Sequence, residues 1–243
     1  MAEIRIDAID PATMALWRTV AKIARALQEE QERWCLVGGL MVALYAIQAG
    51  EIQRPTTDID LLGDARQRPS GTQWVSDRLR DLGAARHEIG GLEGEKGFRF
   101  ELDGQVIDVL APDGLARPAL TGAQLQSMQI PGGSQALRRT ETVAIVVDGQ
   151  RAELRRPTLP AAILLKARSL AVHSRPDDQR EDLITLLGLM SDPRSALAEL
   201  AASERRWLRD AQTRLDLQDR DLDATIDPTR LRIARAAYAR LIA

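Results

Sequence analysis

Cysteine is almost absent from this chain, which has only Cys35 among its 243 residues. A single thiol excludes an internal disulfide and is typical of a reducing compartment. Cys35 lies in an apolar segment just before two glycines, so buried packing is favoured over a role as a nucleophile. The chain also lacks the run of about 20 apolar residues that spans a bilayer, and residues 1–10 show no secretory signal. We therefore expect a cytoplasmic protein with no membrane segment.

Aromatic residues and lysines are also scarce. Aromatic residues make up 3% of the chain, so stacking on aromatic rings cannot be its main way of holding a nucleic acid, and backbone and shape recognition would have to dominate. The 33 basic residues include three lysines, Lys22, Lys96 and Lys166, which leaves 30 arginines. Where arginine is the usual cation, an isolated lysine in an apolar setting calls for an explanation.

The remaining composition is that of a soluble globular protein, with 44% hydrophobic and 28% charged residues. A net charge of −2 does not by itself favour a nucleic-acid partner. A length of 243 residues suffices for one large domain or two smaller ones.

The most informative segment is residues 57–62, with the sequence Thr-Asp-Ile-Asp-Leu-Leu. Its β-branched and apolar residues favour a strand, and alternation places Asp58 and Asp60 on the same face. Adjacent carboxylates repel each other, and a divalent cation that prefers oxygen ligands, such as Mg²⁺, relieves that repulsion. The pair therefore predicts a metal site.

A glycine pair complements this site about twenty residues earlier in the chain. Gly38 and Gly39 separate an apolar strand, residues 34–37, from an apolar helix, residues 40–46. Backbone approaches a ligand closely at glycine, and free N–H groups at a helix start favour an anion. With the carboxylates, these features indicate a nucleoside triphosphate (NTP) bound as its magnesium complex. Either motif alone would more often be a coincidence, because Asp-x-Asp recurs in residues 219–223 without strand-forming neighbours.

The hydrophobic pattern changes character along the chain. Residues 11–32 and 72–82 have helical spacing, and alternation around Asp-Gly turns predicts hairpins over residues 97–110 and 140–154. Residues 114–134 are expected to form loop or irregular helix.

After Pro157 the pattern predicts helices alone. They are expected over residues 158–172, 178–190, 193–202, 204–217 and 228–242. We therefore expect a mixed α/β domain over residues 1–156 and a helical domain over residues 157–243.

Asp108 is a candidate third acid, because it lies in an otherwise apolar strand, residues 106–110. A solvent-facing edge position is the alternative. Beside Asp58 and Asp60, it would complete the carboxylate set that holds two metal ions for nucleotidyl transfer. It is then also the best candidate for the general base.

Lys166 stands on the apolar face of the helix predicted over residues 158–172. It either extends its ammonium to solvent or reaches across a cleft to the phosphates of a nucleotide. Asp182, on the next predicted helix, either orients Lys166, binds substrate or is a surface carboxylate.

Five segments, taken in order, resemble the motifs of DNA polymerase β-like nucleotidyltransferases. Within that superfamily they look most similar to the AbiEii toxin family of type IV toxin–antitoxin systems, which includes the mycobacterial MenT toxins. They are residues 37–39, 54–61, 107–109, 165–167 and 175–183. The resemblance implies an α/β nucleotidyltransferase fold, a mixed sheet flanked by helices, with an all-helical C-terminal domain that binds substrate.

The resemblance also implies roles for single residues. Asp58 and Asp60 match the metal-binding pair and Asp108 the third acid, while Lys166 and Asp182 match the lysine and acid of the helical domain. Two Mg²⁺ ions, with Mn²⁺ as an alternative, would assist transfer of a nucleotide to an RNA 3′ end, as some relatives do with transfer RNA. A cognate antitoxin would oppose that activity.

Two positions depart from the family pattern. Leu40 follows Gly39 where many members have a serine, so phosphate contact would rest on backbone N–H groups, with Thr56 or Thr57 as hydroxyl donors. Gln179 stands where an acid often precedes the position of Asp182.

Three functions follow from these features. The first is transfer of a nucleoside monophosphate from an NTP to RNA by a toxin, for which an arginine path near the cleft would guide phosphates. The second is modification of a small antibiotic-like molecule, and the third is a non-catalytic interaction protein that keeps the fold. The arginine candidates are Arg151, Arg155, Arg156, Arg168, Arg175 and Arg180. The candidate acids for a cationic small molecule are Glu93, Glu95 and Asp103.

Overall fold

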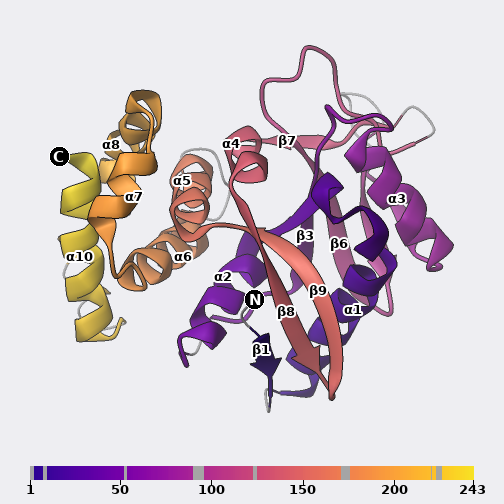
Figure 1. The fold of residues 1–243 in the computed structure, drawn as a ribbon, viewed down its shortest axis with the longest axis horizontal. Helices are drawn as coiled ribbons and strands as arrows, with labels where there is room; N and C mark the ends of the chain where they lie inside the picture. Colours follow the sequence, from indigo (N-terminus) through magenta and orange to yellow (C-terminus); the bar gives the residue numbers. More distant parts are fainter. Residues whose placement is uncertain are drawn as a thin grey trace.

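The structure is a computed structural model that describes residues 3–7, 10–51, 54–89, 96–122, 125–170, 176–219, 221–222 and 226–243. Two sheets and their covering helices occupy one side of the molecule, and a group of helices gathers at the other (Figure 1). The C-terminus lies in that helical group.

The strands within these ranges are short. They are β1 (Glu3–Ile6), β2 (Trp34–Val37), β3 (Asp58–Gly63), β4 (Ala85–Ile89), β5 (Lys96–Leu102), β6 (Gln105–Pro112), β7 (Met128–Ile130), β8 (Thr140–Val147) and β9 (Gln150–Pro157).

Helices separate and follow the strands. They are α1 (Pro11–Ala26), the 3₁₀ helix η1 (Gln28–Arg33), α2 (Gly38–Gln48), α3 (Gly71–Asp81), α4 (Gly133–Arg138), α5 (Leu159–Leu170), α6 (Pro176–Gly188), α7 (Pro193–Glu199), α8 (Ala202–Leu215) and α10 (Pro228–Ile242).

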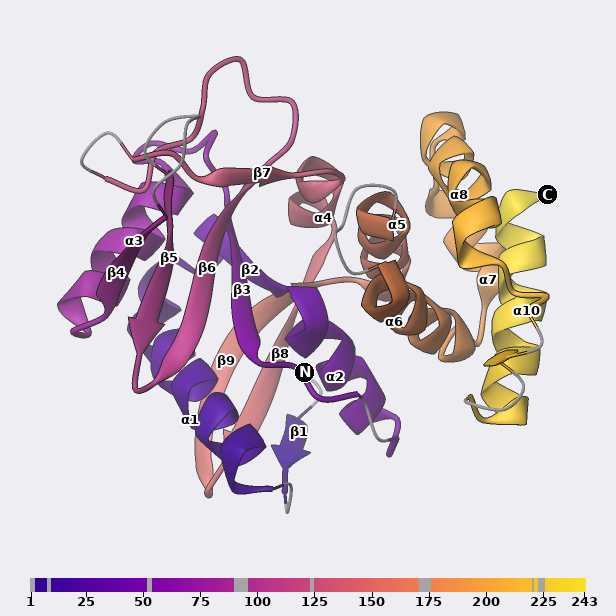
Figure 2. The same cartoon turned by 180° about the vertical axis from the view of Figure 1, so that it is seen from behind.

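The larger sheet is mixed and has the strand order β2-β3-β6-β5-β4, with β7 paired to β6. Strands β3 and β6 run parallel at its centre, whereas β2 and β5 flank them antiparallel. Seen from behind, α2 lies next to β3, and α5 and α6 follow beyond it (Figure 2). This order brings the strand of the Asp pair beside the strand of the third acid.

The smaller sheet contains β1, β8 and β9. Its β8–β9 hairpin turns at Asp148 and Gly149, and the β5–β6 hairpin turns at Asp103 and Gly104, all four with positive φ. Positive φ at both central residues matches the right-handed twist of the strands and favours Asp-Gly. Both predicted hairpins are therefore confirmed.

The two faces of the larger sheet have different surroundings. Ile59 and Leu61 of β3 and Ile107 and Val109 of β6 are buried in the main hydrophobic core, with side chains of α1, α3, β8 and β9. Because side chains alternate along a strand, the residues between them face the opposite side. That opposite face carries the three acids.

Helix α2 is buried from Gly39 to Ala46. Leu40 and Leu44 belong to the main core, whereas Met41, Val42 and Tyr45 pack into a second cluster formed with the later helices. A helix that is apolar all round is stable only when it is covered all round. This explains why the segment after the glycines carries no charge over residues 40–48.

After Pro157 the described part of the chain contains helices and no strand, as the sequence predicts. Helix α6 packs against α5 and α10, and α5 also packs against α8. The division into domains at residue 157 stays a prediction. None of the described helices combines the length and the apolar character that crossing a membrane requires.

Three strands were not expected from the sequence pattern: β1, β4 and β7. Helix α1 ends at Ala26, earlier than predicted, and η1 follows it. Part of the predicted loop at 114–134 forms β7 and α4, because Met128 to Ile130 add to the edge of β6.

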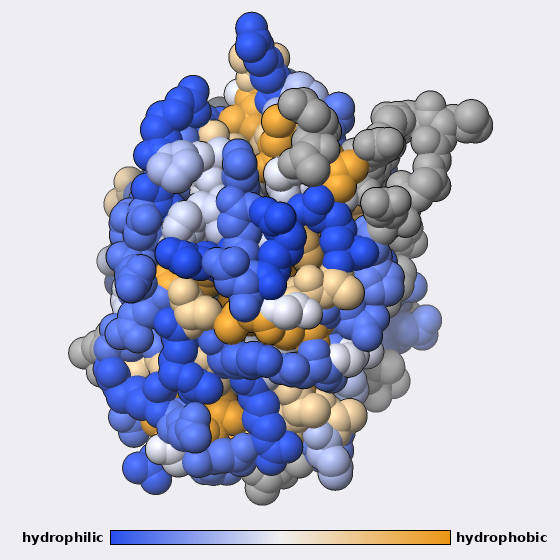
Figure 3. Space-filling model, turned by 90° about the vertical axis from the view of Figure 1, so that its right-hand side faces the viewer, coloured by the Kyte–Doolittle hydropathy of each residue, from blue (hydrophilic) through white to orange (hydrophobic). Residues whose placement is uncertain are grey.

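The outer face of α3 is charged, with Arg80 and Asp81 exposed, Arg78 half-buried, and Trp74 and Val75 buried. The surface seen from that side is mainly hydrophilic with scattered apolar residues (Figure 3). This helix is therefore a cover for the core, as its amphipathic spacing predicts.

The double burial of α2 predicts a large cost for truncating its apolar side chains. Leu44→Ala should lower the free energy of unfolding by about 2–5 kcal/mol, because a fully buried leucine leaves a cavity. Chemical denaturation measures this loss. The control Ile233→Ala, on exposed α10 surface, should change it by less than about 0.5 kcal/mol. Equal effects of the two changes would contradict the burial of α2 between two cores.

Candidate active site

Asp58, Asp60 and Asp108 lie on one face of the larger sheet. In the parallel pairing of β3 with β6, Asp60 is directly opposite Asp108 and Asp58 is opposite Val106. Directly opposed residues in a sheet project to the same side. The predicted neighbourhood of the three acids is therefore present, and it follows from the order and register of β3 and β6.

Gly38 brings the start of α2 against Asp60. It has φ +70°, and a Cβ atom at this position would overlap the Asp60 carboxylate. Only glycine combines this backbone conformation with so close an approach. The side chain of Asp60 is thus held directly beneath the first turn of a helix, where N–H groups lack partners within the helix.

Thr56 and Thr57 line the approach to the acids. The hydroxyl of Thr56 donates to Oδ1 of Asp58 at 3.2 Å, and a Cβ on Gly39 would lie 2.6 Å from the Thr56 hydroxyl. Thr57 is exposed. Of the two residues proposed as phosphate contacts, Thr56 therefore lies beside Gly39, and Thr57 lines the same cavity.

Arg99 of β5 holds the third acid. Its Nε donates to Oδ1 of Asp108 at 2.8 Å and its Nη2 donates to Oδ2 at 2.7 Å, in a bidentate pair. Asp108 is 4% exposed, and the hydrogen bonds raise the pKa of Arg99. A carboxylate buried in a sheet needs such a partner.

On the other side, Asp182 of α6 joins two cations. Its carboxylate lies 2.7 Å from Nζ of Lys166 and accepts from Nε and Nη2 of Arg54 at 3.0 Å each. Lys166 also donates to Oε1 of Gln179 at 3.1 Å. Asp182 is fully buried, so it is inaccessible to a ligand, and its position fits the orientation of Lys166 rather than contact with substrate.

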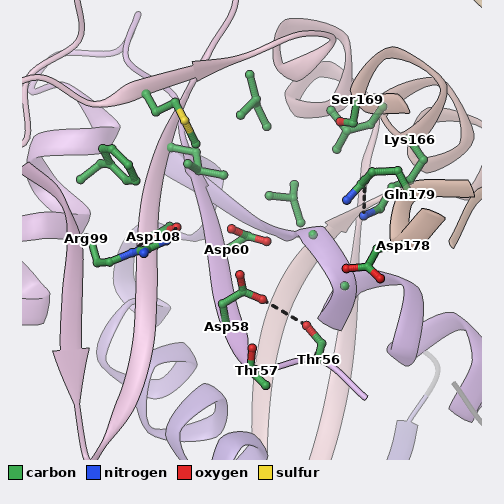
Figure 4. A pocket seen from close by; sticks show the side chains of 18 of the residues that line it. Thr56, Thr57, Asp58, Asp60, Arg99, Asp108, Lys166, Ser169, Asp178 and Gln179 are labelled. Carbon is green, nitrogen blue, oxygen red and sulfur yellow. Dashed lines mark hydrogen bonds and ion pairs between the residues drawn. The ribbon is translucent and has the colours of Figure 1, made fainter. Parts of the chain in front are cut away.

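A cavity of about 500 Å³ unites these groups. Arg99 and Asp108 lie on one side of it, Lys166 and Gln179 on the other, and Asp58 and Asp60 between them (Figure 4). Of the residues predicted as site residues from the sequence, all but Asp182 line this cavity: Gly38, Gly39, Thr56, Thr57, Asp58, Asp60, Asp108 and Lys166. The volume is suited to a small ligand or cofactor.

The charge on the acids is only partly compensated. Burial and the neighbouring charges of Asp58 and Asp108 raise the pKa of Asp60 to about 7, although Lys166 and Arg99 oppose the shift. A raised pKa of this origin means that the site disfavours a further negative charge. Oxygen donors under such repulsion fit a hard divalent cation, so Asp58 and Asp60 suit Mg²⁺ or Mn²⁺.

The expected three-acid cage is not formed by the side chains as they stand. In the described ranges, no three aspartate, glutamate, histidine or cysteine side chains are grouped so that they could hold one metal ion. The reason is the bidentate contact of Asp108 with Arg99, which engages both of its carboxylate oxygens. Asp108 as a metal ligand and general base stays a prediction that requires Arg99 to move or share the carboxylate.

The five arginine candidates that the structure describes form no part of the cavity wall, and an arginine path outside the cavity stays a prediction. None of Arg151, Arg155, Arg156, Arg168 and Arg180 lines the cavity. Arg156 is buried against Glu141 at 2.9 Å, Arg168 lies over Trp207, and Arg180 bonds Asp219 and the α8 C-terminus. These three arginines therefore bind carbonyl, carboxylate and aromatic groups of neighbouring elements instead of pointing into the cavity.

The candidate acids for a cationic substrate do not form a group at the site. Asp103 pairs with Lys22 at 2.9 Å at the tip of the β5–β6 hairpin and does not line the cavity. Glu93, Glu95 and the sixth arginine candidate, Arg175, lie outside the described residues.

Arg54 and Arg99 are two cavity arginines that sequence reasoning missed. Arg99 alternates with Phe98 and Phe100 in a strand, a pattern that signals a side chain on the polar face, although its partner depends on the strand order. Arg54 opens the segment that carries the Asp pair, and its contact with Asp182 spans 128 positions in the chain. No local pattern predicts that contact.

Gly38→Ala tests the contact between the helix start and the acid. It should lower the melting temperature by more than Gly50→Ala, since both residues have positive φ (70° and 74°) but nothing lies within 4 Å of a Cβ at Gly50. The backbone cost common to both is about 1 kcal/mol, so the difference measures the overlap with Asp60. Equal melting temperatures for the two variants would show that Asp60 lies elsewhere.

Asp60→Asn should stabilise the metal-free protein. Because the pKa of Asp60 lies above the ordinary value of 3.8, its ionised form disfavours folding. The penalty grows as the pH rises from about 4 and is complete above about 7. At pH 8 with a chelator, the melting temperature of the variant should be roughly 2–8 °C higher than that of the wild type, which corresponds to about 1–2 kcal/mol in the free energy of unfolding. Adding Mg²⁺ should raise the melting temperature of the wild type further but not that of the variant. A lower melting temperature would contradict the repulsion between the acids.

Comparisons with known proteins bear on the fold. No protein-family model and no curated protein matches the chain. An antigenic nucleotidyltransferase-like protein from Paracoccidioides brasiliensis has a similar structure, with a TM-score of 0.51 and 14% identity over 93% of this chain and 94% of that one. The antibiotic-resistance factor ANT(2'')-Ia has a TM-score of 0.36 and 15% identity, over 95% of this chain and 93% of its own. The first similarity confirms the predicted fold class: the chain has a nucleotidyltransferase-like fold with a helical C-terminal segment.

Proposed function

We propose that this protein is a divalent-metal-dependent nucleotidyltransferase that moves a nucleoside monophosphate from an NTP to the 3′ end of an RNA. The observation that carries the proposal is the contact of Asp60 with Gly38, with Asp58 and Asp108 beside it, in a cavity that Lys166 also lines. Carboxylates under mutual repulsion and the first turn of a helix together suit a cation and a phosphate.

The donor nucleotide is assigned to the side of the cavity formed by α2, α5 and α6. Gly38 and Gly39 offer backbone at the start of α2, and Lys166 faces them from α5. Of the three N–H donors of Lys166, Asp182 and Gln179 engage two, and the third is left for a phosphate oxygen. Asp182 acts here as a positioning residue, because it holds both Lys166 and Arg54 from behind.

The acceptor is assigned to the side of Asp108. In the reaction, a hydroxyl oxygen of the acceptor bonds to the α-phosphorus, the α–β phosphoanhydride bond breaks, and pyrophosphate leaves. Asp108 takes the hydroxyl proton after Arg99 has released one of its oxygens. Mg²⁺ or Mn²⁺ at Asp58 and Asp60, when bound, would supply positive charge to the phosphates.

The biological part of the proposal rests on the resemblance to the AbiEii and MenT toxins. Under this proposal the acceptor is transfer RNA, the modification stops translation, and a cognate antitoxin opposes it. The site supports the chemistry, since the acids, the glycines and the lysine of the five motifs meet in one cavity.

Labelled NTPs test the proposal directly. The protein is incubated with Mg²⁺, each labelled NTP in turn, and either total transfer RNA or a panel of aminoglycosides. We expect label on RNA, loss of labelling in Asp60→Ala, and a decrease of about 10²–10³-fold in Lys166→Ala, which removes charge stabilisation at the leaving phosphate. A chelator should abolish labelling as well.

The second Asp-x-Asp segment of the chain supplies a matched control. Asp221→Asn, in that charged segment after α8, should label RNA at the wild-type rate. Label on the aminoglycosides instead of RNA would replace the proposed acceptor by a small molecule. No label on either, with no binding of NTP, would favour an interaction protein that keeps only the fold.

A further inference from the structure

One large hydrophobic side chain in the cavity wall is exposed. Met128 of β7 is 44% exposed, and the other exposed large hydrophobic residue within the described ranges is Ile233 on α10. Single exposed apolar residues are ordinary on a surface. Met128 differs because it lines the same cavity as the acids.

Strand register extends the apolar surface around Met128. Leu110 pairs with Met128 and Pro112 with Ile130 in the parallel β6–β7 ladder. Leu110 is two residues after Asp108, and Ile130 is two residues after Met128, so all four lie on the face of the acids. We call Leu110, Met128 and Ile130 the β6–β7 wall; all three line the cavity.

The edges of β6 fix which side of the acids Met128 occupies. Strand β3 pairs with one edge of β6 as far as Leu110. Strand β5 pairs with the other edge through Asp108, where Arg99 lies. At Leu110 one edge of β6 is already paired with β3. Strand β7 must therefore pair with the other edge of β6, the edge that β5 occupies at Asp108. Met128 is therefore on the same edge of β6 as β5, the strand of Arg99, and on the opposite edge from β3.

The chemistry of this side suits a planar, uncharged ring attached to an anion. Methionine is flexible and polarisable, and its sulfur makes favourable contacts with aromatic rings. Arg99, whose side chain is 39% exposed, is the cation of this side. A polycationic sugar would meet an arginine and an apolar wall, whereas a nucleotide would place its base on the wall and its phosphate near the arginine.

We propose that the β6–β7 wall binds the nucleobase of the acceptor's 3′-terminal nucleotide, which places its hydroxyl at Asp108. This inference rests on the proposed function and narrows the acceptor to a nucleic-acid end. It also gives a chain with 3% aromatic residues an aliphatic way to hold a base. The NTP base is left to the opposite side of the cavity.

Binding to a short single-stranded RNA tests the wall without requiring transfer. The RNA carries a 5′ fluorophore and a 3′-hydroxyl, and a second version lacks only its 3′-terminal base. Fluorescence anisotropy with Mg²⁺ should show about tenfold weaker binding of the complete RNA to Met128→Ala than to wild type, the lower end of the loss expected for one stacked base. The abasic RNA should bind both proteins equally weakly.

Three controls separate contact from damage. Met128→Leu should restore most of the binding, because an apolar side chain of similar volume remains. Ile233→Ala removes the other exposed hydrophobic residue and should bind as wild type does. The melting temperature and the dissociation constant for NTP should be unchanged in Met128→Ala.

Three results would overturn the inference. Weaker binding of NTP in Met128→Ala, with RNA binding intact, would assign the wall to the donor base. Equal losses for the complete and the abasic RNA would show that no base lies on the wall. Label transfer to RNA with no dependence on Met128 would refute the wall alone, whereas base-dependent binding without any transfer would refute the catalytic proposal and keep the wall.

Discussion

The close packing of Asp60 against the backbone of Gly38 is the constraint on which the site depends. It fixes the distance between the central strand β3 and the start of α2, and it forces the carboxylate into a place where burial and two other acids raise its pKa. Two cations partly offset this repulsion and lower the pKa of Asp60, Lys166 from one side and Arg99 from the other. Without bound ligand, the fold thus keeps an electrostatic imbalance that favours a cation at its centre.

The two cations are held in different ways, so the two sides of the cavity differ. Arg99 binds Asp108 directly, so the third acid is masked by a side chain from the neighbouring strand. Lys166 is held from behind by Asp182, which leaves it facing the acids. Asp182 also binds Arg54, from the segment that precedes β3. One buried carboxylate therefore ties the helical part of the chain to the strand that carries the Asp pair.

The sequence was informative wherever a local pattern set the geometry. Alternation in β3 predicted that Asp58 and Asp60 share a face, and the Asp-Gly turns predicted both hairpins. Asp108 joins that face because β6 lies beside β3 in the register that pairs Asp60 with Asp108, which the sequence offered only as a hypothesis. The partners Arg99 and Arg54 could not be predicted in the same way, because strand order and helix packing bring them to the acids from other segments. The three-residue strand β7 gave no usable period, although Ile4 and Ile6 of β1 alternate with charged residues and could have been recognised.

Helix α2 has a consequence for any attempt to divide the molecule. Its side chains are shared between two hydrophobic clusters, one built with the sheets and one with the later helices. A fragment that ends at Pro157 would expose Met41, Val42 and Tyr45 to water. The helices after Pro157 would in turn lose the apolar surface against which they pack. The sheets and the later helices therefore bury α2 together, and the side of the cavity that α2, α5 and α6 form needs both.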